Sequence, residues 1–505
     1  MSNPLYDRLF GRHAGRNAPF LHLADGSTIR YADFLETAAQ IANLLVRLGL
    51  QPGDRVAAQV EKSAEALALY AACAQAGMVF LPLNTVYTAA ELAYFIADSG
   101  AGLLVCDERQ EGALSQIAKA HGARIATLNG DGSGTLMAQA TALPAGFETV
   151  AREHDDLAAL LYTSGTTGRS KGAMLTQANL LSNATTLVDY WRFTDQDVLL
   201  HALPIFHTHG LFVATNVTLM AGGSMIFLPK FDIDAIFAWL PKASTMMGVP
   251  TFYTRLLDDP RLTRGLVGHM RLFVSGSAPL LAETHIRFAE RTGHRILERY
   301  GMTETNMNTS NPYDGDRRAG TVGFPLPGVD IRITDPASAE ALPAGTVGQI
   351  EVRGPNVFKG YWRMPEKTAA ELRDTGFFIT GDLGLIDKDG YLQIVGRNKD
   401  LIISGGYNIY PKEIELVLDE QPGVLESAVI GVPHADLGET VLGIIVPKPG
   451  VMPDLDAIQA AVAVTLARFK HPRKLVLVSD LPRNTMGKVQ KNVLRETYGE
   501  HFTRP

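Results

Sequence analysis

The sequence predicts an α/β protein with a large N-terminal part of parallel sheets layered with helices, a β-rich subdomain and a small α+β domain at the C-terminus. Strands and helices alternate up to about residue 300, as expected for a parallel sheet covered on both faces. From about residue 322, short β runs separated by Gly, Pro and Asp turns replace this alternation. About a hundred C-terminal residues have strands and helices of their own, enough for a separate domain.

The first elements follow from hydrophobic spacing. Residues 28–49 begin as a strand and continue as an amphipathic helix, whose apolar side chains recur at helical intervals before Gly49. An alanine-rich helix is predicted at 63–76 and ends at Gly77. Further elements alternate around it: strands at 55–60, 79–83 and 102–106, and a helix at 89–99.

The alternation resumes with an apolar strand at 157–162. An apolar helix through Met220 and a helix at 233–240 are predicted among five more strands, at 198–203, 225–228, 245–249, 272–275 and 296–300. Four strand ends in this region carry small, hydroxylated or ionisable loops. Because ligands of open α/β sheets bind beyond the carboxyl ends of the strands, these loops are the candidate site.

The β-rich subdomain is predicted from three short runs, at 329–334, 348–352 and 391–395, with the segment 377–382 between them. Residues 396–400 form a polar break before the last domain. That domain is predicted to contain helices at 411–418 and 455–466, and strands at 425–431, 441–446 and 474–478.

Composition excludes several classes of protein. The 505 residues are too many for one core. A formal net charge of −7 argues against general nucleic-acid binding. Only two cysteines, Cys73 and Cys106, are present, so a disulfide framework or a cysteine zinc site is not expected, which fits a reducing compartment. The N-terminus has no apolar signal core, and no apolar stretch reaches the ~18 residues of a membrane helix. We expect a cytoplasmic protein with neither nucleic acid nor membrane as a partner.

The loop from Thr163 to Gly172 is predicted to hold a polyphosphate. It has five hydroxyls, three glycines, two cations and no acid. Glycines allow backbone N–H groups to approach an anion, hydroxyls donate to phosphate oxygens, and Lys171 supplies a point charge. The spacing Gly-x-x-Gly-x-x-Lys differs from that of the P-loop NTPases. The alternative at this point is an ordinary loop rich in Gly, Ser and Thr.

Five stretches resemble motifs of the adenylate-forming (ANL) superfamily, in that family's order and spacing over nearly the whole chain. They are Tyr162–Gly172, Tyr300-Gly301-Met302-Thr303-Glu304, Thr380-Gly381-Asp382, Gly396-Arg397-x-Lys399-Asp400 and Pro482–Lys488. Within the superfamily the chain most resembles acyl-CoA synthetases, particularly malonyl-CoA synthetases. The resemblance implies a ligase that joins an acid to ATP as an acyl-adenylate, releases pyrophosphate, and then exchanges AMP for coenzyme A, with Mg²⁺ bound.

The resemblance also implies where ATP binds. The phosphates would contact Thr163, Ser164, Gly165, Thr166, Thr167, Gly168 and Lys171. The adenine side of the site would be formed by Ser277, Ala278, Pro279, Glu298, Arg299, Tyr300, Gly301, Met302 and Thr303, with Thr303 also at the α-phosphate. Asp382 would accept hydrogen bonds from the ribose, with Arg397 beside it. Glu304 and Thr163 would hold Mg²⁺, a hard cation that prefers oxygen ligands.

Two further residues are predicted to take part in the reaction. Attack of a carboxylate on a phosphate is opposed by charge repulsion, so cations placed where charge develops are the main catalytic tool. Lys488 resembles the family's adenylation lysine, and also the lysine that acetyltransferases and deacetylases modify in related enzymes. Outside its motif it would be an ordinary surface lysine. His207 matches a substrate-gating position; a core or surface histidine, or a metal site with His209, are the alternatives.

By resemblance the small C-terminal domain is mobile. The domains would span residues 1–398, for ATP and the acid, and residues 399–505, for the catalytic lysine and the coenzyme A tunnel. The second domain would rotate about Lys399 between the two half-reactions. Ser404, Gly405, Gly406 and Tyr407 would then line the pantetheine tunnel, although Gly405-Gly406 also fits a simple bend.

The acid itself is predicted to be malonate, with methylmalonate as a second substrate. A dicarboxylate needs a cation for its distal carboxylate, ideally the forked guanidinium of an arginine. Arg255 follows the strand at 245–249, in a segment that borders the acyl pocket in the family. By the same resemblance, His207, Ser277 and Met302 would also border the acid, whereas the arginines at 287, 291 and 299 are less favoured for the cation.

Other functions fit part of the pattern. A short- or medium-chain fatty acyl-CoA or aryl-CoA synthetase would have the same ATP site with an uncharged acyl pocket. A carrier-loading adenylation enzyme is a second alternative, but no carrier domain follows. A regulatory nucleotide-binding module is a third, but it would need neither Lys488 nor Glu304.

Overall fold

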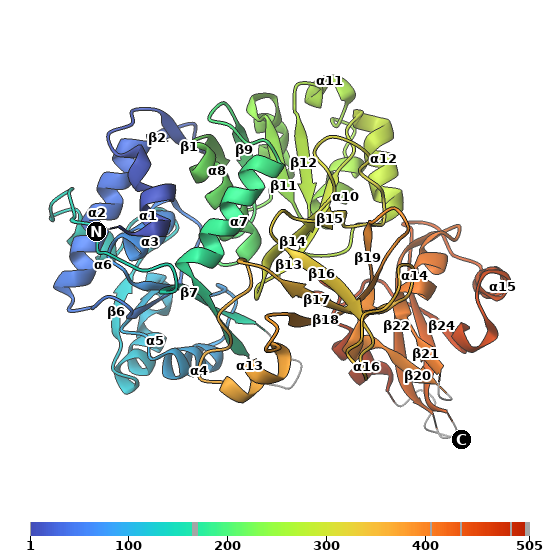
Figure 1. Ribbon diagram of the computed structural model, residues 1–505. Helices are drawn as coiled ribbons and strands as arrows, with labels where there is room; N and C mark the ends of the chain where they lie inside the picture. Colours follow the sequence, from blue (N-terminus) through green and yellow to red (C-terminus); the bar gives the residue numbers. More distant parts are fainter. Residues whose placement is uncertain (1, 164–169, 405–406, 435–436, 485–486, 500–505) are drawn as a thin grey trace. The chain divides into compact units, whose positions relative to one another are not determined.

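The predicted parallel β-structure is present in the computed structural model, which describes residues 2–163, 170–404, 407–434, 437–484 and 487–499. The chain divides into two compact units, which are described separately (Figure 1). The first contains Met1–Asp330 and Val352–Phe378, and the second Ile331–Glu351 and Ile379–Pro505.

A six-stranded sheet forms one layer of the first unit. Its strand order is β6-β5-β3-β4-β7-β8, and all neighbours are parallel except β7 and β8. The bounds are Arg124–Thr127 (β6), Leu103–Cys106 (β5), Arg55–Gln59 (β3), Val79–Pro82 (β4), Leu157–Thr163 (β7) and Lys171–Thr176 (β8). The predicted phosphate loop therefore joins two antiparallel strands.

A nine-stranded sheet forms the second layer, in the order β15-β14-β13-β12-β11-β9-β10-β1-β2. The strands from β13 to β1 in this order are parallel, and β14, β15 and β2 are antiparallel additions at the two edges. The bounds are Phe324–Pro325 (β15), Asn306–Ser310 (β14), Leu297–Met302 (β13), Leu272–Ser275 (β12), Thr245–Gly248 (β11), Val198–His201 (β9), Ser224–Phe227 (β10), Pro19–Leu23 (β1) and Thr28–Arg30 (β2).

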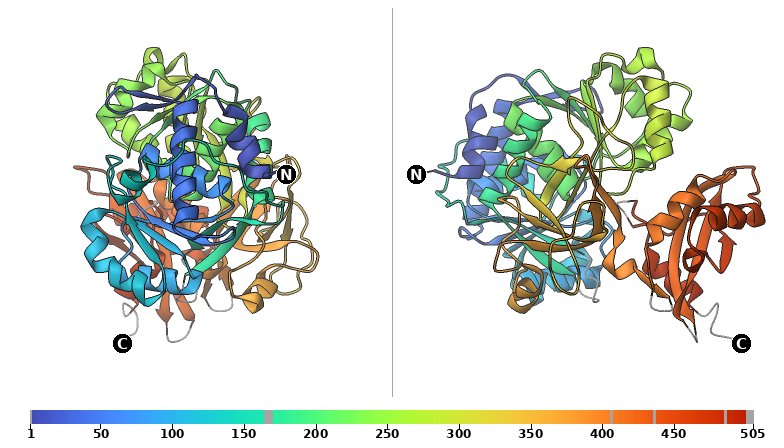
Figure 2. Two further views of the ribbon diagram at one scale, coloured as in Figure 1. Left: turned by 90° about the vertical axis from the view of Figure 1, so that its left-hand side faces the viewer. Right: turned by 45° about the vertical axis from the view of Figure 1, so that its right-hand side comes forward.

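Helices cover these sheets, as the alternation predicts. Helices α4 and α5 pack on the six-stranded sheet through Phe95, Ile96 and Leu114, and α1, α2 and α3 form a group seen in blue in Figure 2. All of α3 except Glu65 is buried, and its alanines allow this close packing. The helices of this unit are Pro4–Leu9 (α1), Tyr31–Arg47 (α2), Ala64–Gln75 (α3), Ala89–Ser99 (α4), Glu108–Ala120 (α5), Thr135–Ala140 (α6), Gln177–Tyr190 (α7), Asn216–Ala221 (α8), Ile233–Trp239 (α9), Pro250–Asp258 (α10), Arg264–Val267 (α11), Ala282–Thr292 (α12) and Pro365–Glu371 (α13).

The second unit contains a four-stranded sheet, β16-β17-β18-β19, and a five-stranded sheet in which β24 pairs with β23 beside β21-β20-β23-β22. The strands are Asp330–Thr334 (β16), Gly348–Arg353 (β17), Phe378–Ile386 (β18), Leu392–Arg397 (β19), Ile402–Ser404 (β20), Tyr407–Ile409 (β21), Val424–His434 (β22), Gly438–Pro447 (β23) and Lys474–Leu477 (β24). The helices are Pro411–Asp419 (α14), Leu455–Thr465 (α15) and Lys491–Tyr498 (α16).

The five-stranded sheet has a hydrophobic core on each face. Val429 and Ile445 point into one cluster with α14 and α15, whereas Ile430 and Ile444 point into another with Leu494 of α16. Strands buried on both faces read as mainly apolar runs, such as 441–446 and the part of 425–431 that follows Glu426 and Ser427, which is why these strands could be recognised in the sequence.

Several segments differ from expectation, and helices α5, α7 and α12 are among those that were not predicted. The segment 377–382, for which no element is predicted, largely belongs to β18. The helix predicted through Met220 begins as a π-helix at His209–Thr215 and continues as α8.

The predicted domain boundary at 398/399 stays a prediction. The four-stranded sheet groups with the C-terminal residues in the second compact unit, but a division into compact units does not show where a hinge lies. Over the part of the chain that the structure describes, the helices are too short or too polar to cross a bilayer.

Candidate active site

The strand ends of the nine-stranded sheet bring the predicted loops to one edge. Strands β9, β11, β12 and β13 are adjacent and parallel, so their carboxyl ends point the same way. The chain beyond them carries His207 after β9, α10 after β11, Ser277 after β12 and Thr303 after β13. The edge-of-sheet location expected from the sequence is thus present.

His209 and Ser277 meet at this edge. His209 is buried at the start of the π-helix, and its Nδ1 lies 3.1 Å from Ser277 Oγ. Ser277 has a φ of 72°, a left-handed conformation that a serine rarely adopts and that is typical of functional turns. Burial lowers the pKa of His209 well below its usual value, and the charge of Arg299 lowers it further. The half-buried His207 accepts the His209 backbone N–H at Nδ1, at 3.5 Å.

Arg299 is a buried cation beside this pair. Its side chain lies against Gly276, where a Cβ atom would be 2.3 Å from Arg299 Cζ, so only glycine leaves room for the guanidinium. Among the described residues, Nε and Nη2 of Arg299 have no hydrogen-bond partner. Burial lowers the pKa of Arg299 to about 9, with the neighbouring Tyr253 acting in the opposite direction, so the guanidinium remains charged at neutral pH.

The segment from Tyr300 to Thr303 is the end of β13 and the start of the turn, residues 303–305, that joins it to β14 in a hairpin. A Cβ atom on Gly301 would lie 1.9 Å from Asn306 O, so this close approach of two backbones requires glycine. Glu304 lies within this turn and is buried. The motif recognised in the sequence therefore has a structural reason for its glycine and places its acid inside the protein.

Glu304 belongs to a polar cluster with Tyr361, Glu371, Lys171 and Thr163. The Tyr361 hydroxyl lies 3.1 Å from Glu304 Oε1 and 2.7 Å from Glu371 Oε2, and the Thr163 hydroxyl lies 3.5 Å from Glu304 Oε1. Lys171 Nζ lies 3.4 Å from Glu371 Oε2 and 4.1 Å from the Tyr361 ring centroid. The phenol has a single hydrogen, which the two carboxylates share.

The two carboxylates of this cluster differ in their acidity. Burial raises the pKa of Glu304, and the charge of Lys171 and the Tyr361 hydrogen bond only partly oppose this. Burial also raises the pKa of Glu371, but hydrogen bonds from Lys367 and Tyr361 and the charges of both lysines outweigh it, so this pKa is lowered. The cluster thus holds one acid that resists ionisation and one that is fully ionised at neutral pH.

These residues fit a magnesium–phosphate site. Thr163 and Lys171 are directly opposite each other on β7 and β8, at the base of the predicted phosphate loop. A buried carboxylate, a hydroxyl and a lysine are the donors expected where Mg²⁺ is held mainly by phosphate oxygens. When Mg²⁺ is bound, it supplies positive charge at those oxygens. The loop residues Ser164, Gly165, Thr166, Thr167 and Gly168 lie outside the described residues.

Tyr361 and Glu371 were not predicted from the sequence. They lie 57 and 67 residues after Glu304, and neither belongs to a motif whose spacing indicates phosphate or metal binding. The segment before Tyr361 is held by α7, where Asn179 Nδ2 donates to Val357 O at 2.8 Å, and by the Glu304 backbone, whose O accepts the Phe358 N–H at 2.8 Å.

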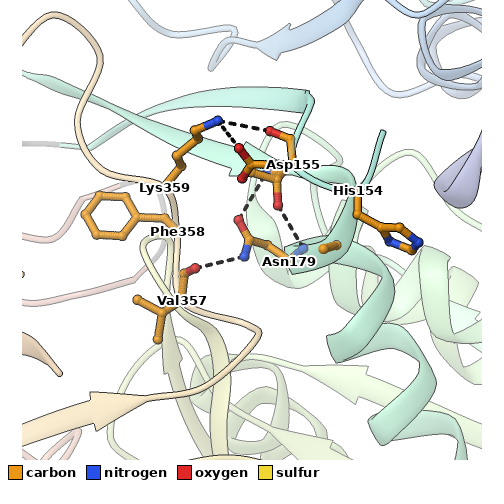
Figure 3. Close-up of a pocket in the computed structure, with 8 residues that line it drawn as sticks. His154, Asp155, Asn179, Val357, Phe358 and Lys359 are labelled. Carbon is orange, nitrogen blue, oxygen red and sulfur yellow. Dashed lines mark hydrogen bonds and ion pairs between the residues drawn. The ribbon is translucent and has the colours of Figure 1, made fainter. Parts of the chain in front are cut away.

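A shallow pocket of about 300 Å³ lies at this attachment (Figure 3). Asp155, Asn179, Val357 and Lys359 line it, and Lys359 forms an ion pair with Asp155. Asn179 donates to the carbonyl oxygens of Pro355 and Val357, and none of the lining residues is a predicted site residue. These contacts anchor the segment that precedes Tyr361.

In the second unit, Asp382 and Arg397 form a pair across β18 and β19. They are direct cross-strand partners, with Arg397 Nε 3.1 Å from Asp382 Oδ1, and Asp382 is buried. Lys399 follows in a short 3-10 turn, where burial and the charge of Arg397 lower its pKa. Asp400 beside it is held by Arg495 of α16 at 2.7 Å.

Lys488 lies in a turn that is closed by backbone hydrogen bonds to Asn484. Arg483 donates to Gly487 O at 2.6 Å and also forms an ion pair with Glu426 of β22. The lysine is thus presented by a turn that an arginine fixes to the sheet. Thr485 and Met486 lie outside the described residues.

The predicted tunnel segment is only partly described. Ser404 is buried at the end of β20, and Tyr407 is exposed at the start of β21, stacked on Phe469 at 4.7 Å between ring centroids. Gly405 and Gly406 lie outside the described residues.

Arg255 lies on α10 and is exposed, with its guanidinium 5.7 Å from the Phe231 ring centroid. Among the residues predicted for the adenine side of the ATP site, Ala278 and Met302 are half-buried and Pro279 is exposed, while Glu298 is buried and accepts the Leu280 N–H at 3.1 Å. Of the two arginines near the strand ends, it is therefore Arg299 that is enclosed.

Comparison with known proteins agrees with this geometry. The sequence matches the AMP-binding enzyme family over residues 10–362 and the AMP-binding enzyme C-terminal domain over residues 413–488. ATP-bound MatB from Rhodopseudomonas palustris has the same fold, with a TM-score of 0.97 and 60% identity, over 99% of this chain and 100% of that one.

Two relatives are similar over nearly the whole chain. A feruloyl-CoA synthase from Amycolatopsis sp is 36% identical and covers 94% of this chain and 95% of its own length. A malonate–CoA ligase from Arabidopsis thaliana is 34% identical and covers 94% of this chain and 85% of its own length. The chain therefore belongs to the AMP-binding enzyme family of the ANL superfamily and is an ATP-dependent acyl-CoA synthetase that uses Mg²⁺ and coenzyme A.

Proposed function

We propose that this acyl-CoA synthetase activates malonate, with methylmalonate as a second substrate. The observation that carries the proposal is the enclosed positive charge of Arg299 at the strand ends, where the acid is expected. A buried charge without a counter-ion is costly, and a dicarboxylate brings the missing anion with it. Similarity to malonate–CoA ligases of Arabidopsis thaliana and Mus musculus supports the same assignment.

The main alternative is an aromatic acid. The feruloyl-CoA synthase is as similar in sequence as the malonate–CoA ligases, so overall identity does not separate the two acids. An aryl group would leave Arg299 buried and without an anion, which argues against this alternative.

We further propose the roles that the motifs imply. Lys488 stabilises the charge that develops as the acid attacks ATP, and Glu304 holds Mg²⁺ with Thr163. Lys171 contacts the phosphates, Asp382 and Arg397 contact the ribose, and His207 gates the acid. The C-terminal residues from 399 rotate about Lys399 between the half-reactions, so that Ser404 and Tyr407 reach the pantetheine arm. Modification of Lys488 by an acetyltransferase would remove its charge and stop the first step.

The test is a pyrophosphate-release screen with malonate, methylmalonate, acetate, octanoate and coumarate, each with and without coenzyme A. We expect malonate to give the highest kcat/KM, with methylmalonate next, and malonyl-CoA to form only when coenzyme A is present. A higher kcat/KM for coumarate or octanoate would contradict the proposal and favour an aryl- or fatty-acyl-CoA synthetase.

A further inference from the structure

Two ion pairs that the ATP site does not explain hold the segment that carries Lys488. Arg483, which precedes the lysine, is paired with Glu426 of β22. Lys491, which follows it, is paired with Glu415 of α14, with 2.5 Å between Nζ and Oε1. The two ends of the segment are thus each tied to a carboxylate, and the two carboxylates come from different elements of the second unit.

Glu415 is the more enclosed of the two carboxylates. It is buried, whereas Glu426 is half-buried, and the oxygen that meets Lys491 also accepts the Val429 N–H at 2.9 Å. Burial raises the pKa of Glu415, but the charges of Lys491 and Lys412 and the hydrogen bonds outweigh it, so the pKa is lowered and the carboxylate is ionised at neutral pH. Apolar side chains often stabilise a protein as well as a buried ion pair does, and the best-attested use of such a pair is to fix one arrangement.

Apolar packing already attaches the segment to the five-stranded sheet. Leu481 and Val489 pack in one cluster with Ile430, Ile444 and Leu494. The hydrophobic effect is non-directional, so this packing does not by itself determine the direction in which a nearby side chain leaves the backbone. The ion pairs are therefore the contacts that can set a direction.

Arg483 connects Glu426 to the backbone beside Lys488. Its Nη1 donates to Gly487 O at 2.6 Å while its Nη2 is paired with Glu426, and Gly487 immediately precedes Lys488. Gly487 has a φ of 74°, a left-handed conformation that favours glycine. Asn484 adds a further contact, because its Oδ1 accepts the Lys488 N–H at 3.0 Å. The backbone that leads into Lys488 is thus held by an arginine that Glu426 orients.

We propose that Glu426 and Glu415 are positioning residues for Lys488, which they direct through Arg483 and Lys491 toward the charge that develops in adenylate formation. This inference rests on the proposed role of Lys488. Because the lysine acts in the first half-reaction, loss of either glutamate should slow that step and leave thioester formation unchanged. A misplacement of about 1 Å can cost about 100-fold in rate, which bounds the effect of losing one anchor.

The experiment measures each half-reaction in a single turnover, with the acid that the wild-type enzyme prefers. Adenylate formation starts from that acid and ATP, and thioester formation starts from the supplied acyl-adenylate and coenzyme A. Glu426→Gln and Glu415→Gln should each slow adenylate formation about 10- to 100-fold, while the rate of thioester formation and the KM for ATP stay within about twofold of the wild type. Glu426→Asp should retain more adenylation than Glu426→Gln, because the negative charge that pairs with Arg483 remains.

Glu351→Gln is the matched control. Glu351 is a buried glutamate of the same unit and is paired with Arg332 at 2.8 Å, but it lies on β17 of the four-stranded sheet. Its loss should lower the melting temperature without changing the ratio of the two half-reaction rates. Thermal melts check that each variant is folded, and the half-buried Glu426 decides the matter if Glu415→Gln does not fold.

A double variant separates positioning from a structural role. Lys488→Ala removes the side chain that is to be positioned, so adding Glu426→Gln to it should slow adenylate formation by less than a further twofold or so. In the wild-type background the same substitution should have its full effect.

Four results would overturn the inference. Equal losses in both half-reactions would make the glutamates structural residues, and an equally selective loss in Glu351→Gln would attribute the effect to general destabilisation. A full further loss when Glu426→Gln is added to Lys488→Ala would show that Glu426 acts independently of the lysine. Wild-type adenylation in both glutamate variants would show that apolar packing alone directs the lysine.

The proposed role of Lys488 can fail separately. If Lys488→Ala forms adenylate at the wild-type rate, the role of the lysine itself is refuted. If Lys488→Ala is slow but Glu426→Gln and Glu415→Gln are not, only the positioning role is refuted.

Discussion

The polar clusters around Glu304 and around Arg299 both lie inside the protein, but they differ in how their charges are balanced. Glu304 has Tyr361 and Thr163 beside it, and Lys171 is paired with Glu371, so charges of both signs are present. Arg299 has no carboxylate beside it among the described residues. The first cluster is complete without ligands and must exchange partners when phosphate arrives. The second lacks an anion, which is the reason to expect that the substrate supplies one.

The largest effect should come from a residue outside both clusters. Lys488→Ala should reduce adenylate formation by about 10²–10³-fold, the usual effect of removing a group that stabilises developing charge. Binding of ATP and malonate should persist, because both clusters remain intact. Single-turnover measurements of each half-reaction test this, with a supplied malonyl-adenylate for the second. Equal losses in both half-reactions would contradict the assigned role.

Glu304→Gln should separate stability from activity. Because the folded-state pKa of Glu304 is raised, its stabilising contribution is complete below the unfolded pKa and is lost as pH rises through the raised value. The nucleotide-free variant has no charge to bury, so its melting temperature should exceed that of the wild type by about 2 °C or more at pH 8, and the difference should shrink toward pH 4.5. Adenylation and its dependence on Mg²⁺ should be severely impaired.

If Glu304→Gln is no more stable than the wild type at any pH, then burial of this carboxylate costs little folding stability. Thermal melts between pH 4.5 and 8 without nucleotide supply this comparison, and Glu290→Gln, at a carboxylate on α12 outside the cluster, is a suitable control.

Glu371→Gln should shift stability in the opposite direction. The folded-state pKa of Glu371 is lowered, so its contribution is present above the unfolded pKa and is lost as pH falls through the lowered value. The variant should therefore be less stable than the wild type at pH 7 and converge with it near pH 4. The variant removes the partner of Lys171 but leaves the lysine itself in place, so the KM for ATP should change by less than about tenfold. If the variant is more stable than the wild type at pH 7, the ion pair between Lys171 and Glu371 does not stabilise the protein.

Tyr361→Phe should have the smallest effect. It removes the hydroxyl that both carboxylates share and costs about 1–3 kcal/mol of stability, the usual penalty for leaving a buried polar group without its partner. Urea unfolding measures this change. Double mutants with Glu371→Gln should show less than additive losses, because the two residues are in contact; strict additivity would mean that they act independently.

Much of the fold could be predicted because its strands are buried and its helices have regular apolar patterns. Strand 272–275 and helix 89–99 agree with β12 and α4, and the two-sided burial of β22 and β23 gave mainly apolar runs. The π-helix at His209–Thr215 could not be predicted, because its apolar sequence fits an ordinary helix equally well. The segment 377–382 was not recognised as β18 because glycine and acidic residues interrupt its apolar pattern.

The candidate site was predicted in part. Lys171 and Glu304 belong to motifs that resemble known ones, and the structure places them in one cluster. Tyr361 and Glu371 join them through contacts that are distant in sequence, so no local spacing indicates them. Arg299 was assigned to the nucleotide by its motif, because the sequence does not reveal which way a side chain at a strand end points. The roles of Lys399, Asp382 and the tunnel residues stay predictions.

The most direct test of the dicarboxylate assignment is the ratio of kcat/KM for malonate to that for propionate in the wild-type enzyme. The two acids differ only in a carboxylate against a methyl group, so the ratio measures what the enclosed positive charge contributes. We expect malonate to be favoured by about 10³-fold or more, as for sites that leave buried polar groups unpaired with the wrong substrate. A ratio near or below one would contradict the account.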